Sequence, residues 1–150
     1  MPRDFALELE RLIESAAPEL ARESSSDRAQ RPSPESWSKC EILGHLIDSA
    51  ANNHQRFVRA QQEDELRFPA YDPPAWVACQ RYGECDWSEL VSLWVAYNRH
   101  LVHVLRVMPR EQLDTSCWVD WCETPQSIPL RAVIEEYLKH VRHHLGQLAR

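Results

Sequence analysis

The 150-residue chain has little glycine, no long apolar run and no excess of positive charge. Three glycines stand against ten prolines, and so few glycines rarely supply the tight turns of hairpin-rich sheets. No stretch approaches the roughly 20 apolar residues that a membrane helix requires. The formal net charge of -6 disfavours nucleic acid and anionic membranes, since both attract clustered Lys and Arg. We therefore expect a helical protein whose partner is a small molecule or another protein.

The five cysteines are odd in number and scattered along the chain. The first residues, MPRDFALELERL, are amphipathic and charged and lack the apolar core of a signal peptide. These features predict a cytoplasmic protein with reduced thiols. Cys117 and Cys122 in the segment CWVDWC have four residues between them, whereas zinc and redox pairs usually have two. We interpret them as packing residues beside Trp118 and Trp121.

Apolar residues recur every three or four positions in four segments, which is the spacing of an amphipathic helix. The segments comprise residues 4–22, 39–62, 86–108 and 129 to near the C-terminus. Ser38 with Glu41 predicts a capping box at the second helix, and Asp86 with Glu89 predicts a similar one at the third. With 43% apolar residues, the chain can bury one core. We expect a single domain over residues 1–150.

The connections between these helices differ in length and composition. Residues 63–85 contain three prolines and four aromatic residues and are too long for a tight helix-to-helix turn. We expect them to form a crossover packed over one end of the bundle. Residues 109–128 are interpreted as a loop whose tryptophans lie against the bundle. The predicted fold is an all-α four-helix bundle with a long crossover between helices 2 and 3.

Three of the seven histidines fall within the segment YLKHVRHHL of the last helix. At about 100° per residue, His144 lies about 50° from the centre of the apolar arc, His140 about 90° and His143 about 150°. His140 and His144 thus flank the buried edge one turn apart, which lets two imidazoles bind one ion, while His143 faces water. The alternative is a set of surface histidines near a helix end, where positive charge is favoured.

A firmly held ion usually takes three protein ligands, and the second helix offers His45 and His54. Periodicity favours His54, about 50° from the centre of the apolar arc, over His45 at about 130°. His100 and His103 are expected at the core edge or the surface. The polar stripe around His45 suits either the wall of a wet cavity, with Asp48 orienting the imidazole, or an exposed face. Its members are Glu41, His45, Asp48, Ser49, Asn52 and Arg56.

Three segments, WSKCEILGHLIDSA, YDPPAWVACQRY and YLKHVRHHLGQL, together resemble the DinB/YfiT-like superfamily of bacterial four-helix bundles. That family typically binds a divalent ion, nickel or zinc, through one histidine of the second helix and two histidines spaced by four in the last. The resemblance implies His45, His140 and His144 as the ligands, with His45 taking the place of His54. Members of known activity are mostly thiol-dependent, such as bacillithiol S-transferases and mycothiol-dependent maleylpyruvate isomerases.

The resemblance implies a metal-dependent thiol S-transferase that uses one Zn²⁺ or Ni²⁺ ion and a low-molecular-weight thiol with a small-molecule substrate. We expect Asp48 or Asn52 to position the incoming group and Arg56 to meet an anionic part of the thiol. One alternative is a hydrolase, for which Glu41, Asp48 and Glu136 are nominal bases. Others are a non-catalytic metal-binding stress-response protein and a purely structural bundle. We expect a homodimer that binds neither nucleic acid nor membrane.

Overall fold

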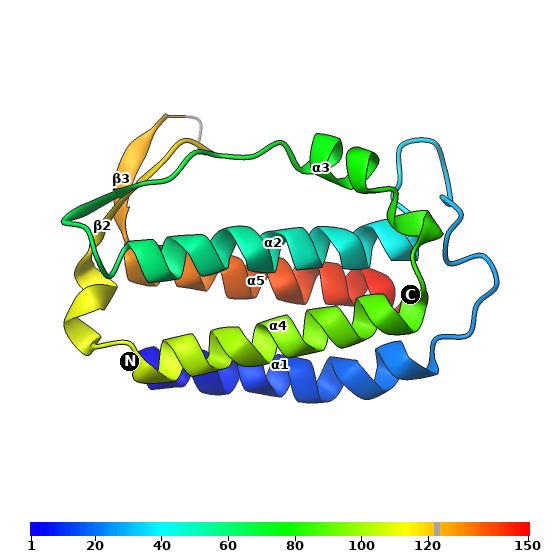
Figure 1. Cartoon of the computed structure of the whole chain (residues 1–150), viewed down its shortest axis with the longest axis horizontal. Helices are drawn as coiled ribbons and strands as arrows, with labels where there is room; N and C mark the ends of the chain where they lie inside the picture. The colour runs from blue at the N-terminus through cyan, green and yellow to red at the C-terminus, as the bar shows by residue number, and fades with distance from the viewer. Residues whose placement is uncertain (122–123) are drawn as a thin grey trace.

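Four long helices lie side by side in the computed structural model, which describes residues 1–121 and 124–150 (Figure 1). They are α1 (Pro2–Arg22), α2 (Lys39–Arg59), α4 (Trp87–Val107) and α5 (Leu130–Leu148). The predicted four-helix bundle is confirmed, and the helices begin and end close to the predicted positions. No helix in the described ranges has the length and apolar content needed to cross a membrane.

Two of the four long helices, α2 and α4, begin where the sequence offers capping groups. The backbone N–H of Glu41 donates to Ser38 Oγ at 3.2 Å, and the N–H of Ser38 donates to the Glu41 carboxylate at 2.8 Å. This reciprocal pair is the predicted capping box. At α4, the side chain of Asp86 accepts from the N–H of Glu89 at 3.1 Å. Both side chains satisfy backbone donors that a helix leaves free in its first turn.

The order of the helices explains the long crossover. In Figure 1, α1 and α5 run in one direction, whereas α2 and α4 run in the other. Each of α4 and α5 packs against both α1 and α2. Because α2 and α4 are parallel neighbours, the chain must return along the whole bundle between them. The crossover therefore runs lengthwise over α2 (Figure 1), and the expectation that it covers only one end is wrong.

The crossover contains short elements of its own and is fixed to α2. Its elements are β1 (Glu65–Arg67), α3 (Pro73–Gln80) and the 3-10 helix η1 (Tyr82–Glu84). Tyr82 donates its hydroxyl hydrogen to Asp48 Oδ1 at 2.6 Å, and Gln80 Nε2 donates to the same oxygen at 2.8 Å. A Cβ at Gly44 would lie 2.1 Å from the ring of Tyr82. Gly44 therefore allows the Tyr82 ring to lie directly on α2.

A small sheet that the sequence did not predict covers one end of the bundle. The segment expected to be a loop holds the 3-10 helix η2 (Arg110–Asp114), β2 (Ser116–Val119) and β3 (Gln126–Pro129). The strand order is β1-β2-β3, parallel between β1 and β2 with Leu66 opposite Cys117, and antiparallel between β2 and β3. Strands of three or four residues are too short for alternation to reveal them. Cys117 is buried as expected, and Cys122 lies outside the described residues.

The two tryptophans of this region contact arginines and stay partly exposed. Trp118 exposes 37% of its surface and Trp121 exposes 44%. The Trp118 ring centroid lies 5.0 Å from the guanidinium carbon of Arg67 in β1, and that of Trp121 lies 4.9 Å from the guanidinium carbon of Arg56 in α2. Trp121 thus lies against the bundle, as predicted, whereas Trp118 lies over the sheet.

Candidate metal centre

Three histidines from two helices converge between α2 and α5. Ring nitrogens of His45, His140 and His144 all lie within 4.8 Å of one another. His45 Nε2 is 2.8 Å from His140 Nε2. The ring centroids are 4.7 Å apart for each pair that includes His45, and 4.5 Å apart for His140 and His144. The structure thus brings together the three residues that the resemblance implied, while the side chain of His143 is exposed.

His45 reaches this group because the polar stripe of α2 is buried rather than exposed. His45, Asp48, Ser49, Asn52 and Arg56 each expose 7% of their surface or less. The crossover and α5 cover the side of α2 that its apolar pattern would leave to solvent. Helical periodicity assumes one buried face, and that assumption fails for a helix covered on both sides. Helical periodicity therefore favoured His54, whereas His45 is the histidine of α2 that contacts α5.

All three imidazoles are neutral near pH 7. Burial lowers the pKa of His45 to about 4, and repulsion from His144 contributes. Burial lowers the pKa of His140 to about 3, with further contributions from His144, His45 and His143. Burial also lowers the pKa of His144, against a smaller opposing effect of its hydrogen bond to Gln147. Each ring therefore keeps a nitrogen lone pair, which metal binding requires.

A hydrogen bond fixes which nitrogen carries that lone pair in one of the rings. His144 Nδ1 lies 2.7 Å from Gln147 Oε1, an oxygen that can only accept, so Nδ1 carries the hydrogen and Nε2 is free. His140 Nδ1 lies 3.3 Å from Ser49 Oγ, which leaves its Nε2 facing His45. His45 Nδ1 is buried without a hydrogen-bond partner. The expected orienting contact from Asp48 is absent among the described hydrogen bonds.

The donor set fits one divalent transition-metal ion. Neutral imidazoles suit zinc and nickel. A tetrahedral ion bound at about 2.0–2.1 Å holds its ligand nitrogens about 3.3 Å apart. The Nε2 atoms of His45 and His140 are 2.8 Å apart, so a slight separation of the two rings would admit an ion. Three protein ligands leave a coordination position for a small molecule.

A cavity of about 310 Å³ adjoins the histidines. Its walls come from α2, α5, the crossover and the segment after β2. The polar and aromatic residues that line it include His45, Ser49, Asn53, Arg56, Tyr71, Trp121, Glu136 and His140. The volume is near the lower end of the range for small-molecule sites.

The structure separates the three residues predicted to assist chemistry. Arg56 lines the cavity, whereas Asp48 and Asn52 are buried outside the described lining. Asp48 Oδ1 accepts hydrogen bonds from two residues of the crossover. Asn52 Nδ2 donates to the backbone oxygen of Asp48 at 2.9 Å. Ser49 and Asn53 occupy the cavity wall instead. Ser49 follows His45 by four residues, so helical spacing alone could have identified it.

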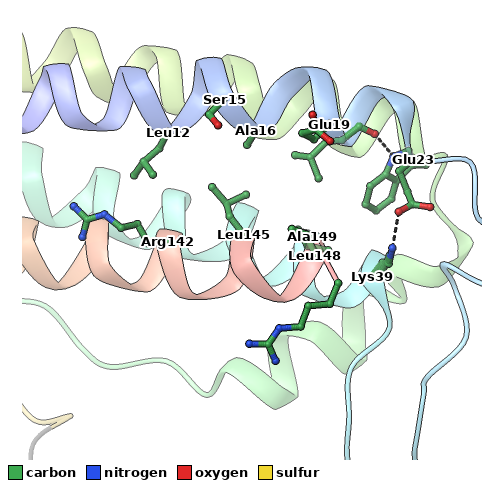
Figure 2. Close-up of a pocket in the computed structure, with 13 residues that line it drawn as sticks. Leu12, Ser15, Ala16, Glu19, Glu23, Lys39, Arg142, Leu145, Leu148 and Ala149 are labelled. Atoms are coloured by element: carbon green, nitrogen blue, oxygen red, sulfur yellow. Dashed lines mark hydrogen bonds and ion pairs between the residues drawn. The ribbon is translucent and has the colours of Figure 1, made fainter.

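A larger hollow of about 540 Å³ lies between α1 and α5, and its lining contains none of these histidines. Figure 2 shows Leu12 and Ala16 of α1 facing Leu145 of α5 across it. At its edge, Lys39 forms an ion pair with Glu23. An apolar hollow with this rim offers no set of metal ligands among its described residues. The candidate metal centre therefore belongs to the smaller cavity.

Comparison with known proteins places the chain in a family. Residues 8–148 match the DinB superfamily, so the chain belongs to that superfamily. A Bacillus subtilis (strain 168) protein named "Putative metal-dependent hydrolase YfiT" is 23% identical over 112 residues. That alignment covers 75% of this chain and 62% of the relative, which is less than two thirds of the relative's length.

A solved structure of YfiT from Bacillus subtilis has the same fold. It is described as "a probable metal-dependent hydrolase with an unusual four-helix bundle topology". The TM-score is 0.84 at 20% sequence identity, and the match covers 99% of this chain and 83% of that one. The likeness therefore extends over all four long helices of this chain.

Proposed function

We propose that this chain is a metal-dependent thiol S-transferase that binds one divalent ion, Zn²⁺ or Ni²⁺, through His45, His140 and His144. The observation that carries the proposal is the convergence of three neutral imidazoles beside a cavity of about 310 Å³. When bound, such an ion lowers the pKa of a thiol or water that coordinates it and so supplies a nucleophile at neutral pH.

The residues around the cavity favour a thiol over water as the nucleophile. A thiol that coordinates a metal loses its proton without help, whereas hydrolysis benefits from a positioned general base. Among the described lining residues, Glu136 is the acidic one, and its exposed carboxylate lies 3.5 Å from Lys139 Nζ. Asp48 is bonded to the crossover and Glu41 to Arg31.

In the proposed reaction, the thiol sulfur forms a bond to an electrophilic carbon, and the leaving group departs with its electron pair. The thiol proton passes to solvent. Ser49 holds the ring of His140 through Nδ1, while Tyr71 and Trp121 provide aromatic walls of the cavity. We assign Asp48 and Asn52 to positioning α2 and the crossover rather than to contact with the incoming group.

An assay with a fluorogenic electrophile tests this proposal. Metal-loaded protein is mixed with monochlorobimane and, in turn, glutathione, cysteine, coenzyme A, bacillithiol and mycothiol. We expect conjugation with at least one thiol above the uncatalysed rate, and its loss after EDTA treatment or in His140→Ala. No metal-dependent conjugation with any of the five thiols would contradict S-transfer.

Hydrolysis is the second candidate, and one observation favours it. Glu136 lines the cavity four residues before His140 on α5, where a carboxylate can accept a proton from water. The relative YfiT is also named as a hydrolase. A metal-dependent release of p-nitrophenol from esters that falls in Glu136→Gln, without thiol conjugation, would favour this function. Metal binding without either reaction would favour the third candidate, a non-catalytic metal-binding protein. The predicted homodimer is a separate expectation, which light scattering tests.

A further inference from the structure

Arg56 is a buried cation in the wall of the same cavity. It exposes 7% of its surface. Its Nη1 donates to Asn53 Oδ1 at 3.4 Å, and its buried Nε has no hydrogen-bond partner. Within residues 1–121 and 124–150, no carboxylate forms an ion pair with it. A charge removed from water is costly unless an opposite charge compensates for it.

The surroundings compensate for this charge only weakly. Burial lowers the pKa of Arg56, while Tyr71 and Asp120 act in the opposite direction. Asp120 is exposed and lies after β2 without forming an ion pair with Arg56. The next arginine on the helix, Arg59, is exposed and bonds to Gln55. Among the residues that the structure describes, no carboxylate pairs with the positive charge of Arg56, although the net charge of the chain is -6.

Two aromatic rings hold the guanidinium in place. Its carbon lies 4.9 Å from the ring centroid of Trp121 and 5.6 Å from that of Phe68. Such contacts stabilise a cation and restrict its rotation. They cannot satisfy its N–H donors, and Nε stays unpaired. A planar carboxylate can accept from the guanidinium N–H groups in a two-point geometry.

Arg56 and His45 lie along one face of α2. His45, Ser49, Asn53 and Arg56 all line the cavity, and the backbone positions of His45 and Arg56 are about 16 Å apart along the helix axis. A molecule that reaches both ends must be elongated, with its reacting atom and its charge at opposite ends.

We infer that Arg56 anchors a carboxylate of the molecule that enters this cavity, so the substrate or thiol co-substrate carries an anionic group remote from its reacting atom. The position of the reacting atom rests on the proposed function. Binding of the carboxylate at Arg56 does not, because this contact needs no metal. The two can therefore fail separately.

The test uses a matched pair of probes, 3-phenylpropionate and its neutral amide, titrated into the full chain after EDTA treatment. Binding is followed by calorimetry and by the side-chain Nε–H signal of Arg56 in nuclear magnetic resonance spectra. We expect wild-type protein to bind the carboxylate at least ten-fold more tightly than the amide. The Arg56 signal should shift with the carboxylate alone. A wild-type protein without this preference, or an Arg56 signal that does not move, would overturn the inference.

Variants separate a specific anchor from general positive charge. Arg56→Gln should lose the carboxylate preference, and Arg56→Lys should keep part of it. Arg59→Gln makes the same change of charge one turn away on the exposed surface and should keep the full preference. His140→Ala should also keep it, which distinguishes anchoring from the metal chemistry. Equal loss in Arg56→Gln and Arg59→Gln would overturn the inference. The wild-type spectra decide the matter if Arg56→Gln does not fold.

Discussion

Both histidines of α2 meet histidines of another long helix, but in different surroundings. His45 joins His140 and His144 of α5, and we call these three the α2–α5 triad. His54 lies near His100 of α4 with ring centroids 5.0 Å apart, close to the 4.7 Å between His45 and His140. His54, His100 and His103 are called the outer histidines here. Ring proximity alone therefore does not separate the two groups.

What separates them is enclosure. His45 exposes 4% of its surface, and His140 and His144 are half-buried. His54 is half-buried as well, whereas His100 and His103 are exposed. Ring nitrogens of the α2–α5 triad converge, and His45 and His140 line a cavity. Nδ1 of His54 instead lies 3.1 Å from the hydroxyl of Tyr97. The crossover makes the difference because it encloses the His45 side of α2, and a metal site requires ligands held in place by their surroundings.

The largest expected effect concerns metal affinity. His140→Ala removes one of the three proposed ligands, and we expect Zn²⁺ affinity to fall by at least about 100-fold, more than the loss of an outer-shell contact. His54→Ala should change it by less than about two-fold, because its ring is not part of the triad. Competition titration with a chromophoric chelator measures both. Equal losses in the two variants would remove the distinction between the groups.

The enclosing crossover depends on a glycine. We expect Gly44→Ala to destabilise the protein by about 2–3 kcal/mol, because the new Cβ would lie 2.1 Å from the ring of Tyr82. Gly146→Ala is the matched control, since a Cβ there has no neighbour within 4 Å among the described residues. It should stabilise α5 by up to about 1 kcal/mol. Urea unfolding gives both values, and similar effects of the two substitutions would contradict the packing described here.

Two tyrosine hydroxyls, one on each side of α2, should differ less in their effect on stability. Tyr82→Phe removes the donor at 2.6 Å from the buried carboxylate of Asp48, and we expect a loss of about 1–2 kcal/mol. Tyr97→Phe removes the contact with half-buried His54, where water can replace the hydroxyl, so the loss should stay below about 0.5 kcal/mol. Chemical denaturation measures the difference, and a larger loss for Tyr97→Phe would argue against an enclosed wall at Asp48.

The smallest expected effect is a pH dependence. Burial raises the pKa of Asp48 against the opposing hydrogen bonds from Tyr82 and Gln80. The native state then holds the proton more tightly than the unfolded state, whose pKa is about 3.9. The contribution of Asp48 to stability should therefore fall as pH rises from this value through the native pKa, while the lowered pKa values of His45 and His140 act in the opposite direction in wild type and variants alike. In Asp48→Asn this fall should be absent, whereas Asp64→Asn, the same change on the exposed surface, should retain it. Urea unfolding from pH 3.5 to 7 measures it, and parallel curves for wild type and Asp48→Asn would contradict the raised pKa.

The sequence alone predicted the parts of the fold that depend on local pattern. The helix periodicity and the capping box at Ser38 placed the four helices, since both are encoded within a few neighbouring residues. The spacing of His140 and His144 likewise predicted that they share an edge of α5 and that His143 faces water. These inferences needed no knowledge of how the helices pack.

The remaining features depend on contacts between distant segments. Periodicity favoured His54 because it could not show that the crossover covers the other side of α2. Only the family resemblance implied His45. The pairing of Leu66 with Cys117 joins two strands about fifty residues apart. A local sequence pattern cannot reveal this pairing, because the strands are too short and too far apart in the chain. The bond between Tyr82 and Asp48, which removes Asp48 from the described cavity lining, is equally non-local.

Anomalous X-ray scattering from a crystal of the protein tests the central claim most directly. The protein is purified without a nickel column and loaded with one equivalent of Zn²⁺, and data are collected on both sides of the zinc absorption edge. The account predicts one strong peak between α2 and α5, about 2.0–2.1 Å from nitrogens of His45, His140 and His144. A peak at the outer histidines, or no peak at the α2–α5 triad, would contradict it.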